Sequence, residues 1–161
     1  MTYIKSTGRI IYDPNRPGMK KRNTGWCIIS VDTEITRYYR WWLEYQYHIH
    51  LQPPSWDAHI SVVRGEFLSD AVKSLWKKYH KQPIEFEYEH GNIQKHRSGR
   101  EQDGIVPGDY YVIDVKCPTI DMIRQELGLK TGYKYHLTVG RSYEYVSRYE
   151  NRKDRRHQSG K

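Results

Sequence analysis

Two short segments of the sequence repeat one pattern of residue types around a histidine. Residues 58–62 (Ala-His-Ile-Ser-Val) and 135–139 (Tyr-His-Leu-Thr-Val) both read apolar, histidine, aliphatic, hydroxyl, aliphatic. Each segment is typical of a strand, and side chains two residues apart on a strand face the same way. The pattern therefore predicts that His59 shares a face with Ser61 and that His136 shares one with Thr138, while the aliphatic residues between them point into the core.

Two imidazoles and two hydroxyls around one cleft suit the cleavage of a phosphodiester bond. One neutral imidazole can remove a proton from the attacking hydroxyl, and one imidazolium can protonate the leaving oxygen. An unperturbed histidine titrates at about 6.5, so both forms are accessible near neutral pH. The hydroxyls can donate hydrogen bonds to the non-bridging phosphate oxygens as charge builds there. We therefore expect four catalytic residues and neither a metal nor a cofactor: His59, Ser61, His136 and Thr138.

Other histidines of the chain give weaker signals. His-x-Ser also occurs at residues 96–98 and 157–159, but without aliphatic flanks and outside the predicted strands. His48 and His50 could chelate a metal, yet they fall where a predicted helix ends, and no Asp, Glu or Cys cluster accompanies them at ligand spacing. The paired motifs therefore favour acid–base catalysis over a metal centre.

The elements that must position these residues alternate along the chain at short spacing, which predicts an α+β or α/β sandwich. Residues 91–105 are polar and contain glycine, which is typical of a hairpin or loop. We expect one two-lobed domain over residues 1–145 and a basic, flexible tail over 146–161. Strands are predicted at residues 7–12, 25–31, 58–63, 84–89, 109–116 and 134–139, and helices at about 33–47, 69–79 and 118–127.

The net charge and the aromatic content favour one class of binding partner. The formal charge is +8 and 14% of residues are aromatic, which favours a polyanion whose bases can stack on rings. Part of the positive charge lies in residues 148–161, a run that is typical of a solvated tail. The two cysteines, Cys27 and Cys117, lie in apolar strand-like runs and are interpreted as buried thiols. No apolar run approaches the roughly 18 residues of a membrane span, so we expect a soluble, cytoplasmic protein with no membrane partner.

The paired motifs resemble the hallmark of the two-histidine phosphoesterase superfamily, which includes the LigT-like RNA 2',5'-ligases and cyclic phosphodiesterases. The resemblance extends over about residues 5 to 142. It implies an α+β fold of two pseudo-symmetric lobes, with one His-x-Ser/Thr motif in each lobe. In such a fold, antiparallel sheets line a central groove and helices lie outside.

Three segments are similar to the phage branch of that superfamily, the anti-CBASS proteins: residues 3–14, 35–40 and 58–66. This resemblance implies metal-independent hydrolysis of 3'-5' bonds in cyclic di- and trinucleotide signals such as cyclic GMP-AMP. It also implies attack by the 2'-hydroxyl, a 2',3'-cyclic phosphate as the first product, and action in the cytoplasm of the host cell if the chain is phage-encoded.

The same resemblance suggests substrate-binding residues, each with a structural alternative. Tyr12 matches a tyrosine that stacks on a base, and it also fits a partly buried strand aromatic. Arg64 fits a phosphate clamp or a surface arginine, and Trp56 fits the wall of a base pocket or the edge of the core. Tyr111 is a weaker candidate of the same kind. Lys134 shares a predicted strand face with His136, where it would face either the phosphates or solvent.

Two other functions are compatible with the same residues. An RNA-end 2',3'-cyclic phosphodiesterase or repair enzyme would use the same histidines, with RNA as its partner. A non-catalytic nucleotide sponge would use them only to hold phosphates. The sequence leaves the preferred bases, the acid and base roles of the two histidines, and a homo-oligomeric state open.

Overall fold

The computed structural model describes residues 2–15, 23–54, 56, 58–97, 105–106, 108–142 and 144–145, and it is rich in strands. The predicted tail over residues 146–161 lies outside the described residues. Mixed α and β structure with antiparallel strands confirms the predicted class in its coarse form. The elements are β1 (Thr2–Tyr12), β2 (Trp26–Ser30), α1 (Thr33–Tyr47), β3 (His59–Arg64), the short 3-10 helix η1 (Asp70–Leu75), β4 (Pro83–Arg97), β5 (Ile105–Val106), β6 (Asp109–Lys116), α2 (Pro118–Glu126), β7 (Tyr135–Arg141) and β8 (Glu144–Tyr145).

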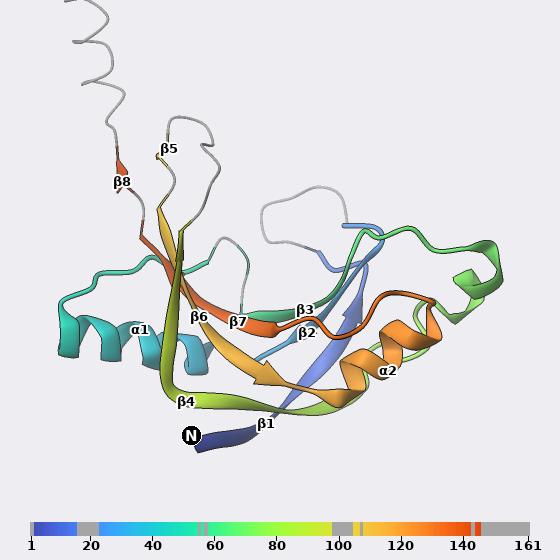
Figure 1. The fold of residues 1–161 in the computed structure, drawn as a ribbon, viewed down its shortest axis with the longest axis horizontal. Coiled ribbons are helices and arrows are strands. Elements are labelled where there is room, and N and C mark those ends of the chain that lie inside the picture. The colour runs from blue at the N-terminus through green and yellow to red at the C-terminus, as the bar shows by residue number, and fades with distance from the viewer. Residues whose placement is uncertain are drawn as a thin grey trace, which may run out of the picture.

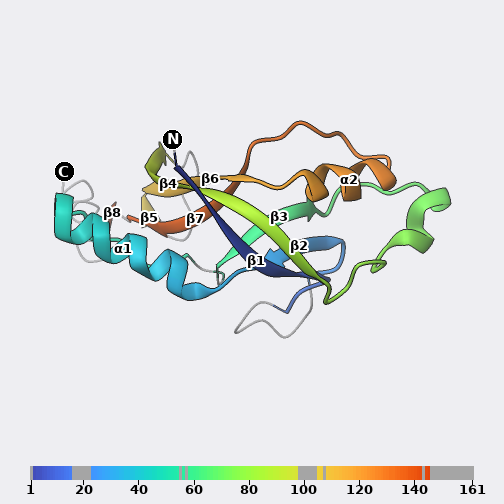
Figure 2. The ribbon, with the colours of Figure 1, turned by 90° about the horizontal axis from the view of Figure 1, so that it is seen from below.

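The long strands close into one antiparallel barrel in the order β1-β2-β3-β7-β6-β4, and β5 pairs with β8 in a separate two-stranded sheet. Along the chain, one succession of elements occurs twice. Strand, strand, helix and strand follow one another as β1, β2, α1, β3 and again as β4, β6, α2, β7. The two units meet where β1 pairs with β4 and where β3 pairs with β7. The helices lie at opposite ends of the barrel (Figures 1 and 2).

β3 and β7 carry the two histidine motifs, and their burial alternates as the sequence predicts. Ile60 and Leu137 are fully buried, whereas the histidine and hydroxyl residues on either side of them are half-buried. The aliphatic residues thus anchor both strands in the core. The opposite face of each strand is left open to a ligand.

Each motif strand also contains a β-bulge at the same place in its motif. Ile28 and Cys27 of β2 pair with Ser61 and Val63, so Val62 is the extra residue of β3. Val112 and Tyr111 of β6 pair with Thr138 and Gly140, so Val139 is the extra residue of β7. Both extra residues follow directly after the hydroxyl residue of their motif. A bulged residue is unpaired in its ladder, and its carbonyl needs another donor.

An arginine from the helix of the opposite unit supplies that donor in both cases. Arg40 of α1 donates from Nη1 to the carbonyl of Val139 at 2.8 Å, and Arg124 of α2 donates from Nη1 to the carbonyl of Val62 at 2.8 Å. The helices themselves begin where the sequence predicts. Asp32 caps α1 by accepting the Glu34 amide, and Pro118 occupies the first turn of α2.

The structure decides between the two alternatives for residues 91–105, a hairpin or a loop. β4 continues through Gly91 to Arg97 and pairs antiparallel with β6 up to Asp109, so the hairpin is confirmed, and its first strand is longer than the predicted strand 84–89. Gly91 has φ of 84°, which other residues rarely adopt, and it lies within the register shift between Tyr88 and Ile93. The glycine therefore bends the strand instead of ending it.

Replacing Arg40 by alanine should lower the free energy of unfolding by about 1–3 kcal/mol, because the partly buried Val139 carbonyl loses its donor. Arg37→Ala is the matched control. Arg37 lies one turn earlier on α1 and makes only an exposed ion pair with Glu34, so its loss should cost under about 1 kcal/mol. Urea denaturation of both variants measures the difference. Equal losses would contradict a structural role for the bond between Arg40 and Val139.

Candidate active site

The pairing of β3 with β7 brings the two motifs together on one face of the barrel. Ile60 pairs with Leu137 in an antiparallel register. The same register places His59 opposite Thr138 and Ser61 opposite His136, and residues directly opposite each other share a face. The two histidines are then diagonal neighbours, with Cβ atoms about 7–8 Å apart. That spacing leaves room for one phosphate between two imidazoles and two hydroxyls.

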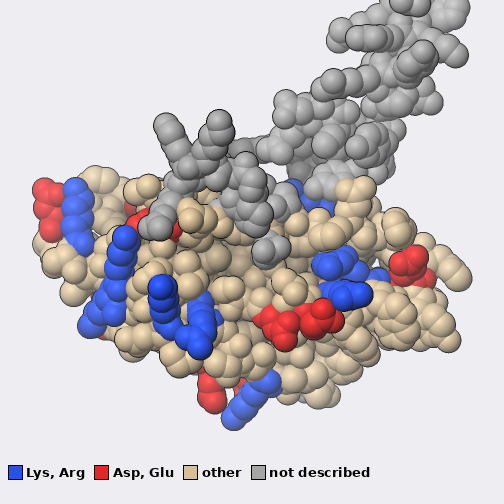
Figure 3. Space-filling view, turned by 180° about the vertical axis from the view of Figure 1, so that it is seen from behind, with Lys and Arg blue, Asp and Glu red and all other residues tan. Residues whose placement is uncertain are grey.

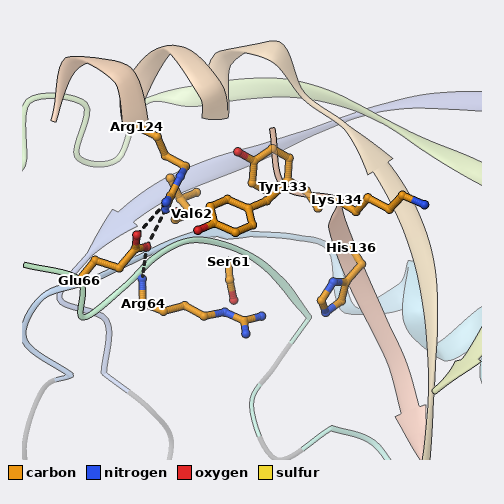
Figure 4. A pocket seen from close by; sticks show the side chains of 9 residues that line it. Ser61, Val62, Arg64, Glu66, Arg124, Tyr133, Lys134 and His136 are labelled. Carbon is orange, nitrogen blue, oxygen red and sulfur yellow. Dashed lines mark hydrogen bonds and ion pairs between the residues drawn. The ribbon is translucent and has the colours of Figure 1, made fainter. Parts of the chain in front are cut away.

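A pocket of about 380 Å³ opens beside His136. It lies between the motif strands and α2, and Figure 4 shows Ser61, Arg64 and His136 on one side of it and Glu66 and Arg124 on another. Arginine, lysine and histidine side chains face this pocket together with a single carboxylate, which suits an anionic ligand. The lining residues are Ser61, Val62, Arg64, Glu66, Arg124, Tyr133, Lys134, Tyr135 and His136.

His136 is held toward its neutral form. Burial lowers the pKa of its imidazole below the usual 6.5, and the Arg64 guanidinium lowers it further. The imidazoles of His96 and His59 add smaller effects in the same direction, while a hydrogen bond with the Lys134 backbone opposes them. A neutral imidazole can accept a proton, so His136 is suited to act as a general base near neutral pH.

An ion pair between a buried arginine and a partly exposed glutamate lines the pocket. Arg124 is only 2% exposed, and its Nη1 and Nη2 each donate to a Glu66 carboxylate oxygen at 2.7 Å. Its Nε donates to the Lys130 carbonyl at 2.7 Å, and the ring of Tyr133 lies 4.8 Å from its guanidinium carbon. Hydrogen bonds from Arg124 lower the pKa of Glu66, which keeps this carboxylate charged. Every donor nitrogen of Arg124 is therefore used within the protein, and the cation that acts on the His136 imidazole is that of Arg64.

His59, the histidine of the first motif, lies against aromatic rings. The ring of Trp56 lies 4.8 Å from the ring of His59, and Trp26 lies 5.8 Å from Trp56 on the far side. Tryptophan is among the side chains on which nucleobases stack. The predicted position of Trp56 at a base pocket fits this geometry.

The remaining predicted binding residues divide into two groups. Arg64 and Lys134 line the pocket, although the Lys134 ammonium points away from His136 in Figure 4. Tyr12 is only 3% exposed, and its ring packs edge-on against Trp76 at 4.8 Å. No ring face of Tyr12 is left for a base, so its structural alternative fits this placement and the stacking role does not. Tyr111 packs against the hydrophobic core.

Tyr110, the neighbour of Tyr111 in β6, lies on the same face of the sheet as His59 and His136. Val112 is directly opposite Thr138, and Tyr110, two residues away on β6, shares the face of Val112. The pairing of Val112 with Thr138 could not be predicted from the sequence, and the choice between Tyr110 and Tyr111 depends on it.

A family model described as the Swiss Army Knife, 2H phosphoesterase domain, matches residues 31–147 and so includes both motif strands. The chain belongs to the 2H phosphoesterase family. Membership implies a hydrolase that acts on phosphodiester bonds, as the paired histidines predict. No curated protein and no solved structure shows a significant match to this 2H phosphoesterase.

Sequence reasoning missed three residues of the 2H phosphoesterase pocket: Glu66, Arg124 and Tyr133. Arg124 did leave a signal, because it occupies the apolar face of α2 between Ile120 and Leu127. A cation on a buried helix face requires an anionic or carbonyl partner. Glu66, which lies two residues after Arg64, could only be identified as that partner from the structure.

The residues of the 2H phosphoesterase that the structure describes contain neither a membrane-spanning helix nor a cluster of metal ligands. No helix there is both long enough and apolar enough to cross a membrane. No group of three or more His, Cys, Asp or Glu side chains in these residues could hold a metal ion. His50, one of the two histidines weighed as a chelator, instead lies 3.4 Å from Glu44 at the surface.

The imidazole of His136 should titrate below pH 6.5, and Arg64→Gln should raise its pKa because a nearby positive charge opposes protonation. Arg37→Gln, on the exposed surface of α1, should leave it unchanged. Chemical shifts of the His136 ring followed by NMR from pH 4 to 9 measure these values. The same pKa in the wild type and in Arg64→Gln would show that Arg64 does not set the protonation state of His136.

Proposed function

We propose that this 2H phosphoesterase hydrolyses 3'-5' bonds in cyclic di- or oligonucleotide signals such as cyclic GMP-AMP, without a metal, as a phage counter-defence against CBASS immunity. The observation that carries the proposal is the pairing of β3 with β7, which sets His59 and His136 diagonally across one site. The segments at residues 3–14, 35–40 and 58–66, which are similar to anti-CBASS proteins, favour this substrate class. Such a protein would act in the cytoplasm of the bacterial host.

In this mechanism His136 is the base and His59 is the acid. Neutral His136 takes the proton from the 2'-hydroxyl, whose oxygen attacks the phosphorus of the 3'-5' bond. The bond between phosphorus and the 5'-oxygen breaks, and that oxygen receives its proton from His59. The first product is a linear nucleotide with a 2',3'-cyclic phosphate at one end and a 5'-hydroxyl at the other.

Three other groups stabilise the charge that develops on the phosphate. Ser61 and Thr138 flank the histidines on the same face and can donate to the non-bridging oxygens. Arg64, beside His136 in the pocket, contributes a positive charge. Each acid–base group is worth roughly 10²–10⁴-fold in rate.

The repeated order of elements supports a further part of the proposal, that the two units are related by a pseudo-twofold axis between β3 and β7. Each unit contributes one motif strand, one bulge and one helix arginine that binds the bulge of the other unit. A two-lobed site built in this way suits a cyclic dinucleotide, whose own two halves are related by a similar axis.

Two features favour a small nucleotide over a long RNA. The pocket volume of about 380 Å³ lies in the range of small-molecule sites, about 300–1,000 Å³. On the face seen in Figure 3, the lysine and arginine side chains of the described residues are interspersed with acidic ones. An RNA-end phosphodiesterase is the alternative enzyme, and a nucleotide sponge is the alternative without catalysis.

The wild-type protein should linearise 3',3'-cyclic GMP-AMP in EDTA, whereas the His59→Ala, His136→Ala double variant should give no detectable product. Chromatography of the reaction identifies the 2',3'-cyclic phosphate product. The cyclic dinucleotide that lacks both 2'-hydroxyls is the control, and it should remain intact because it lacks the attacking group.

Other outcomes of this assay point to the alternatives. Binding of cyclic GMP-AMP without product would indicate a sponge. Preferential cleavage of RNA that ends in a 2',3'-cyclic phosphate would indicate a repair enzyme. Activity that EDTA abolishes and a divalent cation restores would contradict the metal-independent mechanism.

A further inference from the structure

Arg141 occupies the same position in the second motif as Arg64 does in the first. Each arginine lies five residues after its histidine and three after its hydroxyl residue. In each strand the bulge, at Val62 or at Val139, lies between the hydroxyl residue and the arginine. An extra residue shifts the alternation of a strand by one, so the arginine returns to the face of the histidine instead of the core face. The arginine of each strand therefore belongs to the active-site face.

The neighbours of Arg141 agree with this placement. Arg141 pairs with Tyr110 across β6 and β7, and its guanidinium carbon lies 5.2 Å from the centre of that ring. Tyr110 in turn pairs with His96 of β4. Because cross-strand partners share a face, these three side chains form one row across the sheet, next to the row that contains His59 and Thr138.

The backbone of Arg141 is fixed on both sides, and one nitrogen of its side chain, Nε, lacks an acceptor among the described residues. Its amide donates to the Gln52 carbonyl at 2.9 Å and its carbonyl accepts from the Gln52 amide at 2.8 Å. The Nε of Arg141 is buried and has no hydrogen-bond acceptor among the described residues. A buried guanidinium nitrogen without an acceptor is costly, so this position calls for an anion.

The two arginines extend from opposite ends of the site, because β3 and β7 run in opposite directions. Arg64 turns toward His136, where the scissile phosphate lies (Figure 4). Arg141 instead stays over Tyr110, beyond the row of His59 and Thr138. Because of the bulge, Arg141 and Thr138 lie opposite Tyr110 and Val112, which are two residues apart on β6. At about 3.3 Å per residue, the Cα of Arg141 is roughly 7 Å beyond that of Thr138 along the strands. A phosphate bound there is therefore a different phosphate from the one being cleaved.

We infer that Arg141, which lies in one row with Tyr110 and His96, forms a second phosphate subsite that holds the phosphate next to the scissile one. This inference rests on the proposed function and deepens it, because a substrate that uses both subsites must carry two phosphates. The carboxylate on the same face, Asp114, is occupied by a hydrogen bond from Gln94 at 2.9 Å. The subsite favours a cyclic dinucleotide over a single phosphodiester of the same bases.

The test compares 3',3'-cyclic GMP-AMP, with two phosphates, and the linear dinucleoside monophosphate GpA, with one. Both are titrated by calorimetry against the His59→Ala, His136→Ala protein, with and without Arg141→Gln. Loss of a charge-assisted contact should weaken binding of the cyclic dinucleotide about 10-fold or more and leave GpA within about 2-fold. Arg141→Lys, which keeps the charge, should recover part of the loss. Arg64→Gln should weaken both ligands, and Arg37→Gln neither.

Equal weakening of both ligands by Arg141→Gln, or no weakening of either, would overturn the second subsite. Thermal melting of each variant separates a loss of folding from a loss of binding. Turnover by the otherwise wild-type protein is measured in parallel. If the wild-type protein cleaves neither dinucleotide but Arg141→Gln still weakens binding of the cyclic dinucleotide alone, the subsite stands and the hydrolytic function fails. If it cleaves cyclic GMP-AMP as well with Arg141→Gln as without, the subsite alone fails.

Discussion

The active site of this 2H phosphoesterase depends on the pairing of β3 with β7 at Ile60 and Leu137. This contact joins the two repeated units, buries one aliphatic residue from each motif, and leaves the histidines and hydroxyls on the opposite face. The bulges at Val62 and Val139 then turn the chain so that an arginine follows each motif onto that face. Because the carbonyl of each bulge is bound by an arginine from the helix of the other unit, the fold fixes the geometry of the site from both ends.

The two units carry the same elements but give the two histidines different surroundings. His136 lies beside a pocket with Arg64 and the Glu66–Arg124 pair, and burial and positive charge keep it neutral. His59 lies against the tryptophan wall of Trp56 and Trp26. Acid–base catalysis needs two groups in different protonation states, and the two motif strands give their histidines different neighbours.

Much of the site could be predicted from the sequence, because the alternation of a strand fixes which side chains share a face. His59, Ser61, His136 and Thr138 follow from that rule alone. The rest depends on long-range register, which local patterns do not encode. The bulge at Val139 turns Arg141 onto the face of the histidines, and the pairing of Val112 with Thr138 puts Tyr110 on that face and Tyr111 on the other. Tyr12 is buried against Trp76, and Arg124 meets Glu66 only because α2 packs against β3.

The most direct test of the account is a double-mutant cycle on His59 and His136, with kcat/KM measured on 3',3'-cyclic GMP-AMP in EDTA. Two groups that act as one acid–base pair are strongly non-additive. The account predicts that His59→Ala and His136→Ala each lower kcat/KM by roughly 10²-fold or more, and that the double variant loses little beyond the larger single loss. Full activity in either single variant, or losses that simply multiply in the double variant, would contradict the paired mechanism.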